Sequence, residues 1–262
     1  MHFLILSDAH ADTENLQKLD EEFKKADAVI FAGDFTNYNE PEKALPVLEI
    51  LVKKSPVLYA VLGNSDKPAF LDVLEKYDVS VQGTIIFRDG LVFAGSGGAS
   101  KFTGITPNER TEEELMSDFN MVVEHSAQYE EYPFEEDSEN VVEDVSNVEI
   151  SSNNTKQPES NSNDSLEWNN LIVISHNPPK DTKVDMISNG AHVGSASYRF
   201  FLETYQPLLA VSGHVHEAVA VDKIGKTTLI NPGALMEGRY AVVDIQKQKN
   251  EWIVTNASLK KL

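Results

Sequence analysis

The sequence predicts an α/β protein in which two mixed β-sheets pack face to face, with helices on the outside. In the first 80 residues, short apolar runs alternate with helical patterns, which is typical of βαβ units and a largely parallel sheet. Residues 218–258 instead have the pattern of antiparallel strands, with turns at Gly225 and near Asn250. The 262 residues, 41% of them hydrophobic, suffice for a single domain over residues 1–262.

Each unit near the N-terminus is expected to be a buried strand followed by a helix, with Asp12 as the N-cap of the first helix. The expected strands are 3–6, 28–32 and 57–62, and the expected helices are 13–25, 41–53 and 68–77. Ligands of open α/β sheets bind at the carboxyl ends of strands. The polar residues that follow these apolar runs are therefore the first candidates for a site.

The middle of the chain has shorter elements and an acidic segment. Asp89-Gly90 predicts a hairpin turn, and Thr111 followed by Glu114 predicts a capping box. The helix that follows has an apolar side formed by Leu115, Phe119, Val122 and Val123. Residues 128–167 are acidic, rich in Ser and Asn and poor in large apolar residues, so a disordered insertion is expected there.

The α/β pattern then returns in the second half of the chain. An apolar strand over 171–175 ends at His176, and a helix is expected over 197–205. A further strand over 208–212 ends in Gly213-His214-Val215-His216. Both of these strands therefore also end in histidine residues.

The composition excludes several classes of function. No cysteine is present, so thiolate metal sites, disulfides and cysteine nucleophiles are excluded. The segment from Thr103 to Trp168 holds 18 Asp or Glu residues and two Lys or Arg, which is most of the net charge of -20. Without a basic stripe, binding to duplex nucleic acid is not expected. The apolar N-terminus is too short for a membrane span and resembles a buried strand rather than a signal peptide, so a cytoplasmic protein without membrane association is expected.

Five polar clusters follow the apolar runs, and apart from Ser65 they consist of Asp, Asn or His, often after Gly. They are Asp8 with His10, Asp34 with Asn37, Asn64 with Ser65 and Asp66, His176, and His214 with His216. Oxygen and imidazole ligands without sulfur suit divalent metals such as Mn, Fe, Ni or Zn. One carboxylate between two sets of neutral imidazoles suits a two-metal centre, which activates a water as hydroxide and polarises a phosphoryl group.

In this order and spacing, the clusters resemble the motif set of the calcineurin-like metallophosphoesterases, interrupted by the acidic insertion. The segments His176-Asn-Pro-Pro, Gly190-Ala-His192 and Gly213-His214-x-His216-Glu217 are similar to a subgroup of small phosphoesterases. The resemblance implies a four-layer αββα sandwich and two divalent ions. One ion would take Asp8, His10 and His216, the other Asn64, His176 and His214, and Asp34 would bridge them.

One position departs from the family pattern, because Ser65 stands where many members have a histidine that contacts phosphate or protonates the leaving group. His192 is then the candidate general acid, with a metal-bound water as the alternative. Asp34, Asn64 and His192 are the expected catalytic residues. Ser65, Asn37 and Ser195 are candidate contacts to the substrate phosphate, and Asp66 is expected to be the N-cap of the helix that contains Pro68.

These residues predict the metal-dependent hydrolysis of a small-molecule phosphate ester by a metal-activated hydroxide. A phosphodiester is preferred over a monoester, because diester cleavage depends more on metal activation than on a dedicated general acid. The alternative from another class is a non-catalytic scaffold of the same fold, although such members tend to lose metal ligands. A dinucleotide-binding protein is excluded, because the turn Ser7-Asp8-Ala9-His10 lacks the glycines that a pyrophosphate needs.

Overall fold

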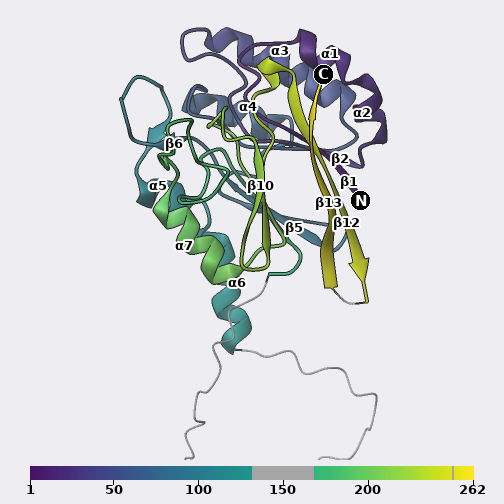
Figure 1. Cartoon of the computed structure of the whole chain (residues 1–262), viewed down its shortest axis with the longest axis vertical. Coiled ribbons are helices and arrows are strands. Elements are labelled where there is room, and N and C mark those ends of the chain that lie inside the picture. Colours follow the sequence, from purple (N-terminus) through teal and green to yellow (C-terminus); the bar gives the residue numbers. More distant parts are fainter. Residues whose placement is uncertain (132–167, 250) are drawn as a thin grey trace, which may run out of the picture.

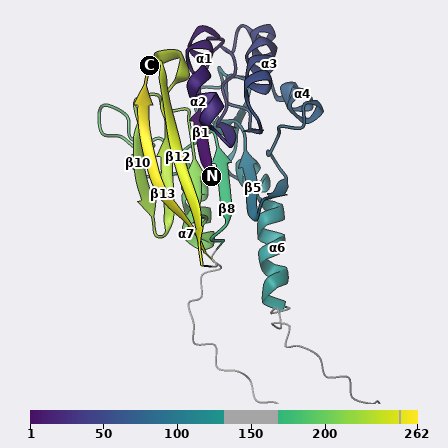
Figure 2. The same cartoon turned by 90° about the vertical axis from the view of Figure 1, so that its right-hand side faces the viewer.

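Two β-sheets form the centre of the protein in the computed structural model, which describes residues 1–131, 168–249 and 251–262 (Figures 1 and 2). The first sheet has five strands in the order β13-β12-β1-β2-β3. Strands β1, β2 and β3 are parallel, whereas β12 is antiparallel to both β1 and β13. The bounds are β1 His2–Leu6, β2 Ala28–Phe31, β3 Leu58–Ala60, β12 Arg239–Gln248 and β13 Glu251–Lys261.

The second sheet has six strands in the order β10-β11-β9-β8-β5-β4. Its four central strands are parallel, and the two edge strands β10 and β4 are antiparallel to their neighbours. The bounds are β4 Ile85–Arg88, β5 Leu91–Ser96, β8 Leu171–Ser175, β9 Leu209–Val211, β10 Ala220–Ile224 and β11 Thr227–Asn231. A short parallel pair, β6 (Ala99–Ser100) and β7 (Glu109–Arg110), lies beside this sheet.

Helices cover the outer face of each sheet. On the first sheet lie α1 Glu14–Lys18, α2 Asp20–Lys25, α3 Ala44–Lys54 and α4 Leu71–Lys76, with the 3₁₀ turns Pro41–Lys43 and Pro68–Phe70. On the second lie α5 Glu112–Ser117, α6 Asn120–Glu131 and α7 Ala196–Tyr205. A third 3₁₀ turn, Leu235–Glu237, precedes β12. Figure 2 shows α6 extending below the sheets.

The alternation of side chains along the strands produces three separate apolar cores. In β1, Leu4 and Leu6 pack against the helices, whereas Phe3 and Ile5 pack between the two sheets. Tyr59 stacks on Phe93 of the facing sheet, with ring centroids 3.9 Å apart. A third core lies under α5, α6 and α7. Three cores between four layers confirm the predicted αββα sandwich.

Several predicted details differ in the structure. The first helix breaks at Leu19 into α1 and α2, although the Asp12 carboxylate does accept hydrogen bonds from the first turn. The Thr111–Glu114 capping box is confirmed. The predicted helix is interrupted between α5 and α6, and Val123 is 40% exposed and does not join the apolar side. Helix α6 also continues through residues 128–131, where the acidic insertion was expected to begin.

The rest of that predicted insertion, 132–167, and the turn residue Asn250 lie outside the described residues. Within the described ranges, no helix is both long enough and apolar enough to cross a membrane.

Candidate metal centre

The predicted ligands lie at the carboxyl ends of strands from both sheets. Asp8 and His10 follow β1, Asp34 follows β2, and Asn64 lies beyond β3 in the first sheet. In the second sheet, His176 follows β8 directly, while His214 and His216 lie beyond β9. Because the sheets pack face to face, these loops meet at one edge of the sandwich, as the sequence predicted.

Several of these residues have a left-handed backbone. The φ values are 55° for Asp8, 45° for His10, 58° for Asp34 and 65° for His214. For a residue other than glycine, this conformation costs about 1 kcal/mol or more of free energy. Neighbouring loops hold the conformation, since the Asp8 N–H donates to Gly33 at 2.9 Å and the His10 N–H donates to Asp34 at 3.1 Å. Backbone strain concentrated in this way is typical of functional sites.

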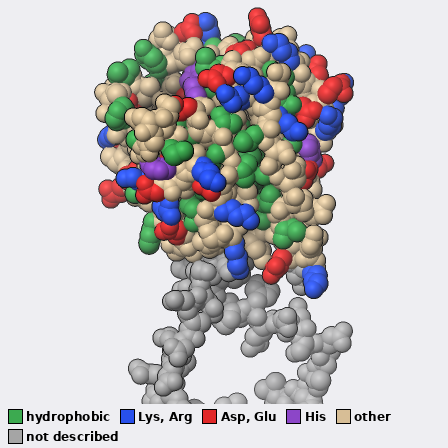
Figure 3. Space-filling model, in the orientation of Figure 1, with side chains coloured by type: hydrophobic (Ala, Val, Ile, Leu, Met, Phe, Trp, Pro, Cys, Tyr) green, Lys and Arg blue, Asp and Glu red, His purple; other side chains and the backbone are tan. Residues whose placement is uncertain are grey.

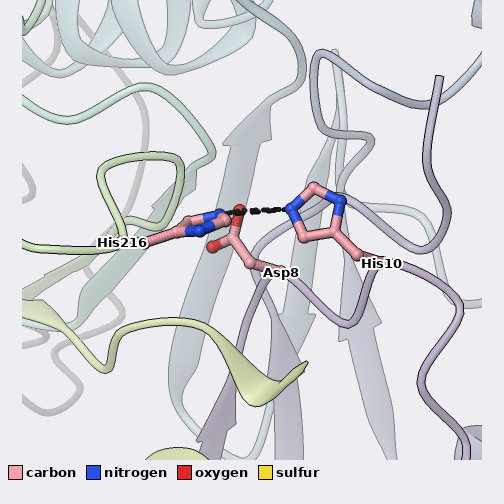
Figure 4. Close-up of side chains that lie close together, drawn as sticks. All are labelled: Asp8, His10 and His216. Atoms are coloured by element: carbon pink, nitrogen blue, oxygen red, sulfur yellow. Dashed lines mark hydrogen bonds and ion pairs between the residues drawn. The ribbon is translucent and has the colours of Figure 1, made fainter. Parts of the chain in front are cut away.

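One group of donor atoms consists of Asp8, His10 and His216 (Figure 4). The Nε2 atoms of the two imidazoles are 3.1 Å apart. The Asp8 Oδ1 atom lies 3.2 Å from His216 Nε2 and 3.8 Å from His10 Nε2. All three donor atoms therefore point at one small volume.

A second group lies beside it and contains Asp8, Asp34 and His176. His176 is fully buried, and its Nδ1–H donates to the Ala32 carbonyl at 2.7 Å. Its Nε2 therefore presents a lone pair, which lies 2.9 Å from Asn64 Oδ1 and 3.6 Å from Asp34 Oδ2. His214 lies next to this group, with its ring centroid 5.2 Å from that of His176, but is outside the two compact groups of donor atoms in the described residues.

Asp8 belongs to both groups, and Asp34 belongs to the second group but also lies close to His10 of the first. The Asp34 Oδ2 atom is 3.6 Å from His10 Nε2 and also 3.6 Å from His176 Nε2. Ser65 fixes the carboxylate from behind, because its N–H donates to Oδ1 at 2.7 Å and its Oγ–H donates to Oδ2 at 3.0 Å. The Ser65 hydroxyl, expected to contact phosphate, therefore orients the central carboxylate instead.

The donor separations fit divalent ions. Donors bound at about 2.1 Å to one ion lie roughly 3 to 4.2 Å from one another. In the first group the three separations are 3.1, 3.2 and 3.8 Å, and those around His176 are 2.9 and 3.6 Å. Imidazole, carboxylate and amide oxygen donors match the preferences of Mn, Fe, Ni and Zn.

Burial and charge set the protonation of these side chains. Burial raises the pKa of Asp8, but the hydrogen bond from His216 and the nearby His176, His216 and His10 outweigh it and hold that pKa well below its usual range. Burial lowers the pKa of His214 to about 4, so this imidazole is neutral at neutral pH. The hydrogen bond with Asp8 raises the pKa of His216. A cation binding at His216 therefore competes with a proton there, whereas the imidazole of His214 is already neutral.

Asp66 has a structural role different from the predicted helix N-cap. Its buried carboxylate accepts hydrogen bonds from the backbone N–H groups of Phe35, Thr36 and Gly63, and so ties together the loops that carry Asp34 and Asn64. The 3₁₀ turn at Pro68 has no side-chain cap. Burial, reinforced by the charge of Asp34, raises the pKa of Asp66 to about 7.

The metal-ligand loops open into a cavity of about 840 Å³. Asn64, His214 and His216 line this cavity, and so does His192. His192 is held by a residue that the sequence analysis missed, because its Nδ1 lies 2.7 Å from Oδ1 of the buried Asp185. The only sequence signal for Asp185 is a carboxylate seven residues before a Gly-flanked histidine.

Asp185 is itself fixed by the loop around it. Its carboxylate accepts hydrogen bonds from the N–H groups of Asp181, Thr182 and Gly194 and from the Thr182 hydroxyl. A carboxylate with this many donors keeps a fixed orientation. With Nδ1–H directed at Asp185, the Nε2 atom of His192 is the nitrogen left for a ligand.

Two predicted phosphate contacts have other partners. Ser195 is fully buried and caps α7, with its Oγ accepting from the Tyr198 N–H and donating to Glu112. It does not line the cavity, so the expected phosphate contact at the start of this helix is wrong. The Asn37 amide donates to the His10 carbonyl at 3.3 Å and to Glu40 at 3.0 Å, which orients the loop that carries the candidate ligand His10.

Comparison with known proteins agrees with this geometry. Residues 1–218 match the calcineurin-like phosphoesterase family over the part of the chain that carries every residue of both donor groups. The chain belongs to the calcineurin-like phosphoesterase family. Its ordered motifs and its αββα fold are therefore those of a metallophosphoesterase.

Individual relatives of this phosphoesterase are distant. The uncharacterized protein MJ1162 of Methanocaldococcus jannaschii is 28% identical over 233 residues, covering 86% of this chain and 85% of that protein. The crystal structure of TT1561 of Thermus thermophilus covers 97% of this chain and 98% of its own, with a TM-score of 0.60 and 18% identity. The calcineurin-like phosphoesterase YfkN of Bacillus subtilis has a TM-score of 0.55 and 12% identity, with 100% of this chain and 90% of its own covered. These two structures share the fold.

Proposed function

We propose that this protein hydrolyses a small-molecule phosphate ester at a centre of two divalent ions, and that phosphodiesters are better substrates than monoesters. The observation that carries the proposal is the position of Asp34, whose Oδ2 atom is 3.6 Å from an imidazole nitrogen of each donor group. Two bound ions supply Lewis-acid activation of the phosphoryl group and of a water at neutral pH.

The protein side chains supply orientation and proton transfer. Ser65 and Asn37 hold the Asp34 carboxylate and the His10 loop in place. His192, fixed by Asp185, faces the same cavity as the ligands and would protonate the leaving oxygen through Nε2. The preference for diesters rests on Ser65, because its hydroxyl is occupied by Asp34 and so the chain lacks a second proton donor at that position.

The direct test is turnover of bis-p-nitrophenyl phosphate and p-nitrophenyl phosphate by protein purified without a His-tag. Mn²⁺, Ni²⁺ and Zn²⁺ are each added, and metal content is measured by elemental analysis. Two ions per chain and faster hydrolysis of the diester support the proposal. Failure to exceed the metal-only blank with every ion would favour the non-catalytic scaffold.

Replacing His192 by Gln is expected to slow the hydrolysis of esters with poor leaving groups far more than that of p-nitrophenyl esters. A general acid contributes about 10²-fold or more when the leaving oxygen needs a proton, whereas p-nitrophenolate departs without one. We expect kcat for a phenyl ester to fall about 100-fold and kcat for the p-nitrophenyl ester by less than about 5-fold.

The matched variant for that experiment is Asp185→Asn, which should reproduce part of the leaving-group dependence by releasing the His192 ring. An equal loss for both leaving groups in His192→Gln would assign His192 to binding rather than to proton transfer. Metal content is measured in parallel and is expected to stay unchanged.

A further inference from the structure

An aromatic side chain stands almost fully exposed at the rim of the metal cavity. Phe102 lies in the loop between β6 and β7, and 93% of its surface is accessible to solvent. Phe102 lines the cavity together with Lys101 and Thr103, and the same cavity is lined by His214 and His216. Figure 3 shows histidine side chains at the surface among hydrophobic and charged ones on this face of the molecule.

The loop that carries Phe102 is held in place by one carboxylate. Glu109 accepts hydrogen bonds from the backbone N–H groups of Phe102 and Gly104 at 2.8 Å, and from those of Ile105 and Thr106 at 3.1 and 3.3 Å. It also accepts from the hydroxyls of Thr103 and Thr106. These backbone hydrogen bonds lower the pKa of Glu109 to about 2, so the carboxylate is charged at neutral pH.

Apolar side chains also line the cavity. Ile187 and Val193 come from the loop that carries His192, and Val215 lies between the two ligand histidines. Val193 is 42% exposed. The cavity is thus lined by candidate metal ligands, by charged groups such as Lys101 and Arg239, and by apolar side chains, which suits a ligand with an anionic head and an apolar body.

We propose that Phe102 is a specificity-determining residue that binds a planar aromatic group of the ester by stacking, while the phosphate lies at the metal ligands. This inference rests on the proposed function, because it assigns the organic part of the same substrate. Glu109 already fixes the backbone of the loop, so stacking of a second ring on Phe102 requires no further ordering of that backbone.

The test compares two phosphonates that share a head group and differ in the organic group. Phenylphosphonate and methylphosphonate are titrated into Mn²⁺-loaded protein by isothermal calorimetry, so the readout does not depend on turnover. The wild-type protein should bind the phenyl compound at least about 10-fold more tightly, a difference of about 1.4 kcal/mol. In Phe102→Ala this preference should fall to about 2-fold or less, whereas Phe102→Tyr should keep it.

Ile105→Ala is the matched control, because Ile105 is 64% exposed on the same loop and does not line the cavity. It should keep the full phenyl preference. Absence of a phenyl preference in the wild type, or the same preference in Phe102→Ala, would overturn the assignment. Hydrolysis assays on the wild-type protein separate the two proposals. Normal turnover without a phenyl preference would disprove only the role of Phe102. A phenyl preference without turnover would disprove only the hydrolase activity.

Discussion

Replacing Asp34 by Asn is expected to abolish hydrolysis, with a loss of about 10³-fold or more in kcat, and to reduce the bound metal below two ions per chain. The Asp34 carboxylate would help to hold two ions, which when bound supply several kcal/mol of transition-state stabilisation. The amide has no charge and only one oxygen to offer. The Ser65 contacts can be kept, because the amide oxygen accepts from the Ser65 N–H and the NH₂ group donates to the Ser65 hydroxyl, so the substitution tests the charge of Asp34.

The measurement is turnover together with elemental analysis, and circular dichroism verifies that the variant is folded. Asp78→Asn is a suitable control, because Asp78 has a φ of 56° like the 58° of Asp34 but lies exposed after α4. The control removes one carboxylate from a left-handed position and should leave activity unchanged. Metal content and turnover in Asp34→Asn equal to those of the wild type would disprove the two-metal centre.

Replacing Gly63 by Ala is expected to give the second largest effect, a loss of about 10²-fold or more in activity with the fold retained. A Cβ atom at this position would meet Asp34 Oδ1 at 1.9 Å and the Asp34 backbone nitrogen at 2.2 Å. The substitution therefore has to displace the central carboxylate, and a misplacement of about 1 Å at a catalytic centre costs about 10²-fold.

Gly97→Ala provides the control for steric strain alone. A Cβ at Gly97 would approach Gln82 Oε1 at 2.0 Å, but the Gln82 side chain can move without displacing a proposed ligand. We expect Gly97→Ala to keep its metals and its kcat, and Gly63→Ala to lose both. Thermal unfolding of both variants separates a local displacement from a general loss of stability.

The sequence predicted most of the fold and the ligands because both depend on local patterns. An apolar run followed by Asp, His or Asn predicts a strand end and a candidate ligand together, and Asp8, Asp34 and His176 do lie just after strands, close to one another. Asp185 and Glu109 were not predicted, because their roles depend on hydrogen bonds from backbone N–H groups that come together only in the folded loops.

The residues around the centre show the same limit. Ser65 and Asp66 were recognised as polar residues after a strand, but their partners belong to the Asp34 loop, about 30 residues away in the chain. Ser195 was expected to use its position at a helix start for phosphate, whereas the fold places Glu112 there. A sequence pattern does not show which group, distant in the chain, forms the hydrogen bond with a given hydroxyl.

The two donor groups draw their members from strands that belong to different sheets, with Asp8, His10 and Asp34 on one side and His176 and His216 on the other. Candidate ligands from opposite sheets are far apart in the sequence. Bound cations would therefore cross-link the two sheets through these side chains. Separating the layers would then require release of the cations, and their free energy of binding would add to the resistance of the sandwich to unfolding. The same metal-binding side chains would thus serve both catalysis and the stability of the fold.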